Sequence, residues 1–318
     1  MPELGALVEL AALFGTSVDA LIGYRSRDGA LPVSLRRLRE LRDARRFEEG
    51  EEEARRLLRN FPNSFEAVYH AATFYSCSGF VRAEPEQLRT SIELLERSLT
   101  LLPQNTDEEV GELSIRRAIA DAHILLGERE EGVRELKRHN DGGVNDLSIG
   151  ATLSLTERKD EARRYLFRAL LEEAANLARL MFGFTNVCEG PQETRQALEL
   201  LDGAQGFFAS LTEPGGSSFF TKLEASLFAV SAELYASLGR PADAENALRR
   251  AWEAARRFDE APCYSVTAVR FCCGDPLPAA FDDIGETAAQ GVERLIDENS
   301  ESAALLRPLW EEWRHEKA

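Results

Sequence analysis

The sequence predicts an all-α protein built from paired helices, and three observations support this fold class. Apolar residues recur at helical spacing along nearly the whole chain, and few segments combine β-branched residues with strict alternation. Proline and glycine interrupt this pattern at intervals the length of a helix. Small residues recur at fixed places within the helices, where they allow a neighbouring helix to approach closely.

The charge of the chain argues against several classes of partner. Its 318 residues carry a net charge of −17, and both nucleic acids and anionic membranes repel such a chain. No stretch approaches the ~18 uninterrupted apolar residues of a membrane-spanning helix. No basic-then-apolar signal segment opens the sequence. We therefore expect a cytoplasmic protein without membrane contact.

The cysteines, histidines and acidic residues give no sign of a catalytic or metal site. The five cysteines show no C-x-x-C spacing, and the four histidines lie far apart in the sequence. The common nucleotide-binding, hydrolase and metalloprotease motifs are missing, and the acidic run at 48–53 is typical of an exposed helix face. We expect free thiols, no metal, no cofactor and no enzymatic activity.

The first 24 residues predict two short helices. The first carries four apolar residues on one side: Leu4, Leu7, Ala11 and Phe14. A turn at Gly15 follows, and a capping box from Thr16 to Asp19 begins a second helix that stops at Gly23. Residues 25–32 are expected to form a linker to the rest of the chain.

Three later helices share one spacing, with steps of three, one, three and four residues. These sets are Val68, Ala71, Ala72, Tyr75 and Gly79; Arg116, Ile119, Ala120, His123 and Gly127; and Phe228, Ser231, Ala232, Tyr235 and Gly239. The first four positions of each set fall on one helical stripe, where the small residue gives room to a neighbouring helix. The glycine supplies the left-handed conformation that ends a helix and reverses the chain.

A second spacing, with steps of four, three and five residues, predicts the antiparallel partner helices. Its members are Gly50, Ala54, Leu57 and Pro62; Ser91, Leu95, Ser98 and Pro103; and, for the first two steps, Ala244, Leu248 and Ala251. Small residues again mark close contacts, and the prolines end the partner helix before the next pair begins.

These two spacings resemble the tetratricopeptide repeat, a helix pair of roughly 34 residues that stacks into a right-handed superhelix. Residues 45–79 and 219–255 match best. The sequence departs from the pattern in a longer stretch between Gly79 and Ser91, and in Arg116 and His123, which replace apolar and aromatic residues. The resemblance implies a tetratricopeptide-like α-solenoid over residues 33–318, closed by a capping helix at 304–317. An ordinary helical bundle, in which alanine and glycine match by chance, is the alternative.

Residues 142–214 fit the repeat poorly. Segments 158–182 and 191–208 both have helical apolar spacing. Degenerate repeats and irregular helix pairs are equally compatible with this region.

In such a superhelix, first-helix residues outside the packing stripe line the concave groove. By spacing, the candidate ligand-binding residues are Tyr69, His70, Thr73, Arg117, Asp121, Val230 and Glu233. The expected occupant is a peptide or a protein segment. The array lacks the lysine and asparagine set with which chaperone-binding members hold a C-terminal carboxylate, so a co-chaperone role is disfavoured.

The beginning of the chain is similar to the last two helices of the phage-repressor-type helix-turn-helix domain, the XRE or Cro-like family. The matching residues are Pro2, Leu7, Leu10, Ala11, Phe14, Ser17, Asp19, Leu21, Ile22 and Gly23. In that family the helix that enters the major groove lies upstream of this segment. DNA binding would therefore use helices missing from this chain. Two explanations stay open: a start codon placed too far downstream, or a loss of DNA binding.

A Cro-like domain followed by tetratricopeptide repeats resembles a class of Gram-positive transcriptional regulators, and residues 239–269 resemble the last repeat and tail of such proteins. The resemblance implies that the groove binds a peptide or protein effector, changes the geometry of a homodimer and so controls DNA binding. The alternative is a free-standing scaffold that binds proteins without DNA.

Residues 25–46 are basic, with eight arginines against three acidic residues. Arg25, Arg27 and Arg36 are therefore candidates for contacts with DNA phosphates. The alternative is a solvated helix face, with ion pairs from Arg36 to Glu40 and from Arg39 to Asp43.

Overall fold

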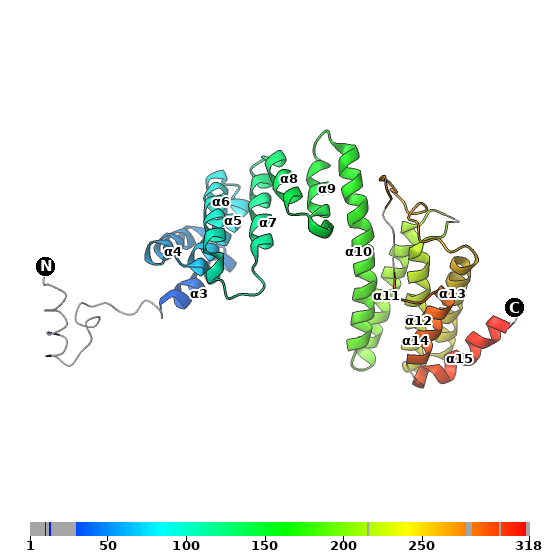
Figure 1. Ribbon diagram of the computed structural model, residues 1–318. Helices are drawn as coiled ribbons and strands as arrows, with labels where there is room; N and C mark the ends of the chain where they lie inside the picture. Colours follow the sequence, from blue (N-terminus) through cyan, green and yellow to red (C-terminus); the bar gives the residue numbers. More distant parts are fainter. Residues whose placement is uncertain are drawn as a thin grey trace. The chain divides into compact units, whose positions relative to one another are not determined.

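The computed structural model describes residues 10, 13, 30–214, 216–277, 282–298 and 300–315. These residues are all-α, with two short 3-10 turns and one isolated β-bridge between Thr212 and Val269. The chain divides into two units, Met1–Leu153 and Ser154–Ala318 (Figure 1). Apart from Leu10 and Leu13, which are helical, the predicted helix-turn-helix remnant lies outside the described residues, as do Arg25 and Arg27.

The first unit is a series of helices joined by short turns. They are α3 (Ala30–Asp43), α4 (Phe47–Asn60), α5 (Phe65–Arg82), α6 (Pro85–Leu101), α7 (Glu112–Leu125), α8 (Arg129–Arg138) and α9 (Asp146–Leu153), with 3-10 turns at Leu102–Gln104 and Asp141–Gly143. Each helix packs against its successor in the chain, and α3 also packs against α5. This is the arrangement of a tetratricopeptide-like solenoid, with α3, α5 and α7 as first helices of their pairs.

The small residues lie where the helices cross, as the spacing predicts. Ala72 and Ala120 are fully buried, and Ser91 of α6 donates a hydrogen bond of 2.9 Å to the carbonyl oxygen of Ala72 in α5. A Cβ atom added at Gly50 would lie 2.3 Å from the ring of Phe74. Glycine at this position therefore sets how closely α4 and α5 pack.

Gly79 does not end α5, which corrects the sequence-based prediction. The helix continues to Arg82 and stops at Ala83, whose φ is +55°. A Cβ atom at Gly79 would lie 2.9 Å from Cγ of Leu88 in α6, so the glycine serves close packing. Gly127 and Gly239 do have positive φ, at +82° and +67°, as predicted. The extra residues after Gly79 are explained by the longer helix.

The two unusual residues of the third set take part in ion pairs. Arg116 contacts Glu112 at 2.8 Å and, across the helix pair, Glu135 of α8 at 3.0 Å. Nδ1 of His123 lies 2.7 Å from a carboxylate oxygen of Glu128. Polar pairing replaces apolar contact at the edge of this repeat, while Ile119 and Ala120 keep the centre buried.

The second unit contains longer helices. They are α10 (Lys159–Val187), α11 (Pro191–Leu211), α12 (Phe219–Ser237), α13 (Pro241–Glu260), α14 (Ala288–Glu298) and α15 (Ser300–His315). The two helices expected at 158–182 and 191–208 are confirmed as α10 and α11. Their lengths are 29 and 21 residues, and the two helices pack against each other.

Helix α12 is the centre of the second unit. All of residues 219–232 are buried, and α12 packs against α10, α11, α13, α14 and α15. A helix that is surrounded on all sides carries apolar residues all round. The segment expected to form the capping helix is helical as α15, whose fully buried Trp310 meets Trp252 of α13 edge to face at a centroid distance of 5.1 Å.

Candidate functional site

The predicted groove residues of the first unit lie together on α5 but are partly buried. Tyr69, His70 and Thr73 are all of intermediate exposure. The Tyr69 ring stacks on Phe65 at a centroid distance of 5.5 Å and meets His70 edge to face at 5.7 Å. The hydroxyl of Thr73 donates to the carbonyl oxygens of Tyr69 and His70, both at 3.0 Å. Thr73 is therefore occupied by its own helix, whereas the two rings form an aromatic surface.

Basic side chains of α3 lie beside this surface. Burial lowers the pKa of His70, and the nearby charges of Arg39 and Arg42 lower it further. Burial raises the pKa of Tyr69, and the charge of Asp107 adds to this effect. We call the group of Arg39, Arg42, Tyr69 and His70 the α3–α5 face.

The ion pairs expected within α3 do not form between the described side chains. Arg37 pairs with Glu40 at 3.9 Å, and Arg42 pairs with Asp43 at 2.9 Å. Arg36 and Arg39 are exposed and form no ion pair with any described residue. The expected pairs used a spacing of four residues, whereas these pairs have spacings of three and one.

The remaining predicted residues fall on α7 and in the second unit. Arg117 and Asp121 are exposed on α7. Val230 is buried and Glu233 is half-buried, and both line a cavity beside α12. The seven candidates therefore do not form one site: three lie on α5, two on α7 and two beside the cavity of the second unit.

The cavity of the second unit has a volume of about 620 Å³ and is formed by four elements. The end of α10, one side of α12, the loop at 283–284 and α14 contribute to its wall. The charged residues of this wall are Glu233, Asp283, Arg294 and Glu298, and its apolar residues are Phe182, Val230, Leu234, Ile284 and Leu295. Ser226, Thr185 and Asn186 add neutral polar groups.

Glu233 has an unusual environment within this cavity. Burial raises its pKa to about 7, and the neighbouring charge of Glu298 contributes to the increase. Its Oε1 atom is buried and has no hydrogen-bond partner among the described residues. At neutral pH this carboxyl group is therefore poised between its protonated and ionised forms.

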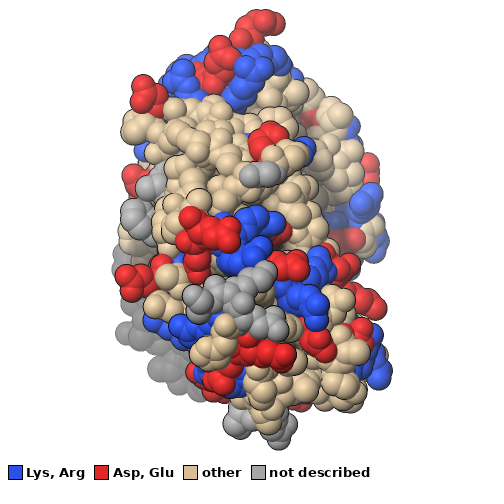
Figure 2. Space-filling view, turned by 90° about the vertical axis from the view of Figure 1, so that its right-hand side faces the viewer, with Lys and Arg blue, Asp and Glu red and all other residues tan. Residues whose placement is uncertain are grey.

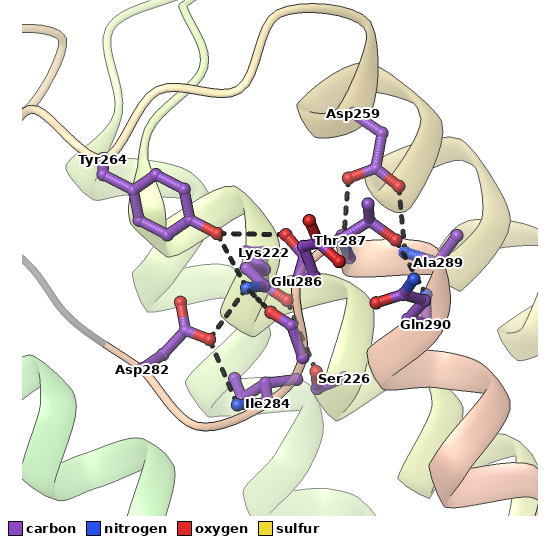
Figure 3. Close-up of polar contacts among 12 residues, drawn as sticks. Lys222, Ser226, Asp259, Tyr264, Asp282, Ile284, Glu286, Thr287, Ala289 and Gln290 are labelled. Carbon is purple, nitrogen blue, oxygen red and sulfur yellow. Dashed lines mark hydrogen bonds and ion pairs between the residues drawn. The ribbon is translucent and has the colours of Figure 1, made fainter.

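A buried ion pair holds the loop that closes one side of the cavity (Figure 3). Lys222 of α12 is fully buried, and its Nζ atom donates to Asp282 at 2.8 Å, to the Tyr264 hydroxyl at 2.9 Å and to the Gly285 carbonyl at 2.5 Å. Burial opposes the charge of this lysine, but the hydrogen bonds to Asp282 and Tyr264 outweigh it and raise its pKa. The ammonium group thus ties together three chain segments.

A second contact fixes the start of α14 (Figure 3). Both carboxylate oxygens of Asp259, in the last turn of α13, accept backbone N–H groups of α14, from Ala288 at 2.8 Å and Ala289 at 3.0 Å. A carboxylate satisfies free N–H groups at a helix N-terminus and complements the helix dipole. One wall of the cavity is therefore anchored at both its loop and its helix.

Close backbone packing completes this wall. A Cβ atom added at Gly291 of α14 would lie 2.4 Å from Cγ2 of Ile284 and 3.1 Å from its carbonyl oxygen. Glycine is required here because the loop lies directly on the helix.

Most of this site was not predicted from the sequence. Lys222 and Glu224 interrupt an otherwise apolar run in α12, which is a signal of buried charges with partners. The partner Asp282 lies 60 residues further along the chain, and helical spacing gives no information on contacts of that length.

The described part of the chain contains no group of three or more His, Cys, Asp or Glu residues placed to hold a metal ion. None of its helices is both long and apolar enough to cross a membrane.

No protein-family model and no curated protein matches the chain. Among solved structures, the chain is similar to the TPR-like repeats of a putative kinesin light chain from Podosopora anserina. The identity is 14% over 75% of this chain and 100% of that chain, with a TM-score of 0.30. MamA has 12% identity over 70% of this chain and 95% of its own, with a TM-score of 0.29. BtubC (BKLC) from P. vanneervenii has 14% identity over 79% of this chain and 99% of its own, with a TM-score of 0.31. At these scores the likeness assigns no function to this chain.

Proposed function

We propose that this chain is a helical-repeat binding protein that holds a peptide or protein segment on the α3–α5 face of its first unit. The observation that supports this most is the half-buried Tyr69 ring, which stacks on Phe65 and meets the His70 ring. The charge of Arg39 acts on His70, and this exposed arginine forms no ion pair with any described residue. The few residues that carry most of the binding energy in protein interfaces are enriched in tryptophan, tyrosine and arginine. The proposal involves no catalytic step.

The test is a peptide-display selection against the full chain, followed by affinity measurements on the selected peptides. Tyr69→Ala and Arg39→Ala should each weaken binding by about tenfold or more, because each removes an anchor of the contact. Arg59→Ala is the matched control, since Arg59 is an exposed arginine on α4 outside this face. The proposal fails if no selected peptide loses affinity in the first two variants, or if Arg59→Ala weakens binding equally.

We also propose a more specific hypothesis, in which the chain is the effector-sensing part of a cytoplasmic, homodimeric transcriptional regulator. The supporting observation is the match of ten residues between Pro2 and Gly23 to the Cro-like pattern. DNA would be contacted through helices encoded upstream. On the face of the molecule seen in Figure 2, acidic and basic side chains are interspersed without a continuous basic patch, as expected if that face does not bind DNA.

The genomic sequence before the codon for Met1 tests the hypothesis of a transcriptional regulator. An in-frame extension that encodes three short helices would support a regulator. A stop codon at that place would leave the scaffold as the function.

A further inference from the structure

We propose that the cavity beside α12 binds an organic cation, a primary ammonium or guanidinium group on an aliphatic stem, with the charged head between Glu233 and Glu298. This site lies in the second unit and does not depend on the proposed peptide contact of the first. Four features of the cavity support the proposal.

The cavity has the shape for an extended ligand. Its lining follows α12 from Ser226 to Ser237, a length of about 16 Å at the rise of an α-helix. The volume of about 620 Å³ is in the range of small-molecule sites. Apolar side chains from three elements, including Phe182, Val230 and Leu295, form the part of the wall that an aliphatic stem would contact.

One end of the cavity is electronegative because three helices end there. Its lining includes Asn186 in the last turn of α10, Ser237 at the end of α12 and Glu298 at the end of α14. The C-terminus of a helix carries a partial negative charge of about half an electron, which favours a cation. The carboxyl groups of Glu233 and Glu298 lie at this same end and add to its negative potential.

The charged side chains of the lining favour a cation overall. Three carboxyl groups, those of Glu233, Asp283 and Glu298, face the cavity with a single basic side chain, Arg294. Arg294 is exposed, as are Asp283 and Glu298, so the half-buried Glu233 carries the charge of this lining that solvent screens least. The pKa of Glu233 is raised by burial and by the charge of Glu298.

Glu233 is a desolvated acid without a counter-charge. Its Oε1 atom is buried without a partner among the described residues, and an ionised carboxylate in such a place is destabilised until a cation compensates it. In the free chain a proton supplies this compensation at and below neutral pH, because the pKa is about 7. A bound cation would displace that proton, so binding and proton release are coupled.

Isothermal titration of the full chain tests the proposal with three probes: agmatine, spermidine and the blocked peptide acetyl-Gly-Arg-Gly-amide. At pH 8 at least one probe should bind with a Kd of about 1 mM or tighter. Affinity should fall by roughly tenfold between pH 8 and pH 6, because Glu233 gains a proton. Titrations near pH 7 in buffers of different ionisation enthalpy should reveal proton release.

Glu233→Gln and Glu298→Gln should each weaken binding by roughly tenfold, the loss expected when a charged hydrogen-bond partner is removed. Glu199→Gln is the matched control, because Glu199 is an exposed acid on α11 outside the cavity. Glu233→Gln should also abolish the proton release while its melting temperature stays equal or rises. This separates loss of the site from loss of the fold.

The probes also distinguish the sources of the cation. Binding of the free amines alone identifies a small-molecule site, and tighter binding of the peptide identifies a basic side chain of a protein; both outcomes support the proposal. The proposal is overturned if none of the three probes binds at about 10 mM, or if both Gln variants bind them like the wild type. It is also overturned if free glutamate, titrated as an anionic control, binds through Arg294 instead.

Discussion

Glu233 makes the stability of the second unit dependent on pH. Its folded-state pKa of about 7 lies above its ordinary value near 4.5, so the folded chain binds this proton more tightly than the unfolded chain. Stability is therefore lost as pH rises from about 4.5 through 7, by an amount on the order of 3 kcal/mol at most.

Replacement of Glu233 by glutamine should remove this dependence. The wild-type chain should lose unfolding free energy relative to Glu233→Gln between pH 5 and pH 8, since only the carboxyl group must ionise in a buried place. Urea unfolding at several pH values measures the difference. Parallel curves for the two proteins would contradict the assigned environment.

Loss of Lys222 should strongly destabilise the second unit. Lys222→Ala leaves the carboxylate of Asp282, whose side chain is 5% exposed, buried without its cation, at a cost of about 3–5 kcal/mol. Lys222→Met combined with Asp282→Asn removes both charges and should recover much of this loss. Thermal unfolding of the single and double variants gives the comparison, and equal losses in both would show that the pair is not coupled.

The residue scale is also where sequence reasoning was weakest. A charged residue in an apolar run shows that Lys222 needs a partner, but helical spacing cannot identify Asp282 in a distant loop. Val230 and Glu233, which the spacing placed outside the packing stripe, both line the cavity beside α12, and a role in ligand binding stays a prediction. Their cavity could not be foreseen, since α10 and α14 contribute its other walls.

At the scale of helices, the glycines separate into packing and turn positions. Gly50→Ala should destabilise the chain by about 1–3 kcal/mol, because the added methyl group meets the ring of Phe74 at 2.3 Å and overpacks the crossing. Gly203→Ala is the matched contrast: it lies within α11 with nothing within 4 Å of the added atom. That change should stabilise the chain by about 0.5–1 kcal/mol through helix propensity. Denaturant midpoints of the two variants should move in opposite directions.

Most of the helices were predictable because each carries its own periodic signal. The repeated small residues identified the crossings at Ala72 and Ala120 without knowledge of the structure. The end of α5 was placed wrongly, since Gly79 was interpreted as a stop although its role is to admit Leu88. A glycine in a sequence does not distinguish a left-handed turn from a close contact, because both require the missing Cβ atom.

At the scale of the whole molecule, the two units provide separate cores. One apolar cluster includes Leu57, Phe74 and Leu95 of the first unit, whereas another includes Leu248, Val292 and Trp310 of the second. We expect Lys222→Ala to increase amide hydrogen exchange in α12–α15 while α4–α8 keep their protection, because local opening follows cooperative units. A uniform loss of protection over all these helices would show that the units unfold as one.

The hydrogen bonds from the first amides of α14 to Asp259 carry an implication for the order in which the chain assembles. The acceptors are the two carboxylate oxygens of Asp259, in the last turn of α13, so α14 finds them only after the end of α13 is in place. During synthesis, the last two helices should therefore dock late, onto a finished surface. Helices α14 and α15 would then pack after the rest of the second unit has folded, and would not nucleate its folding.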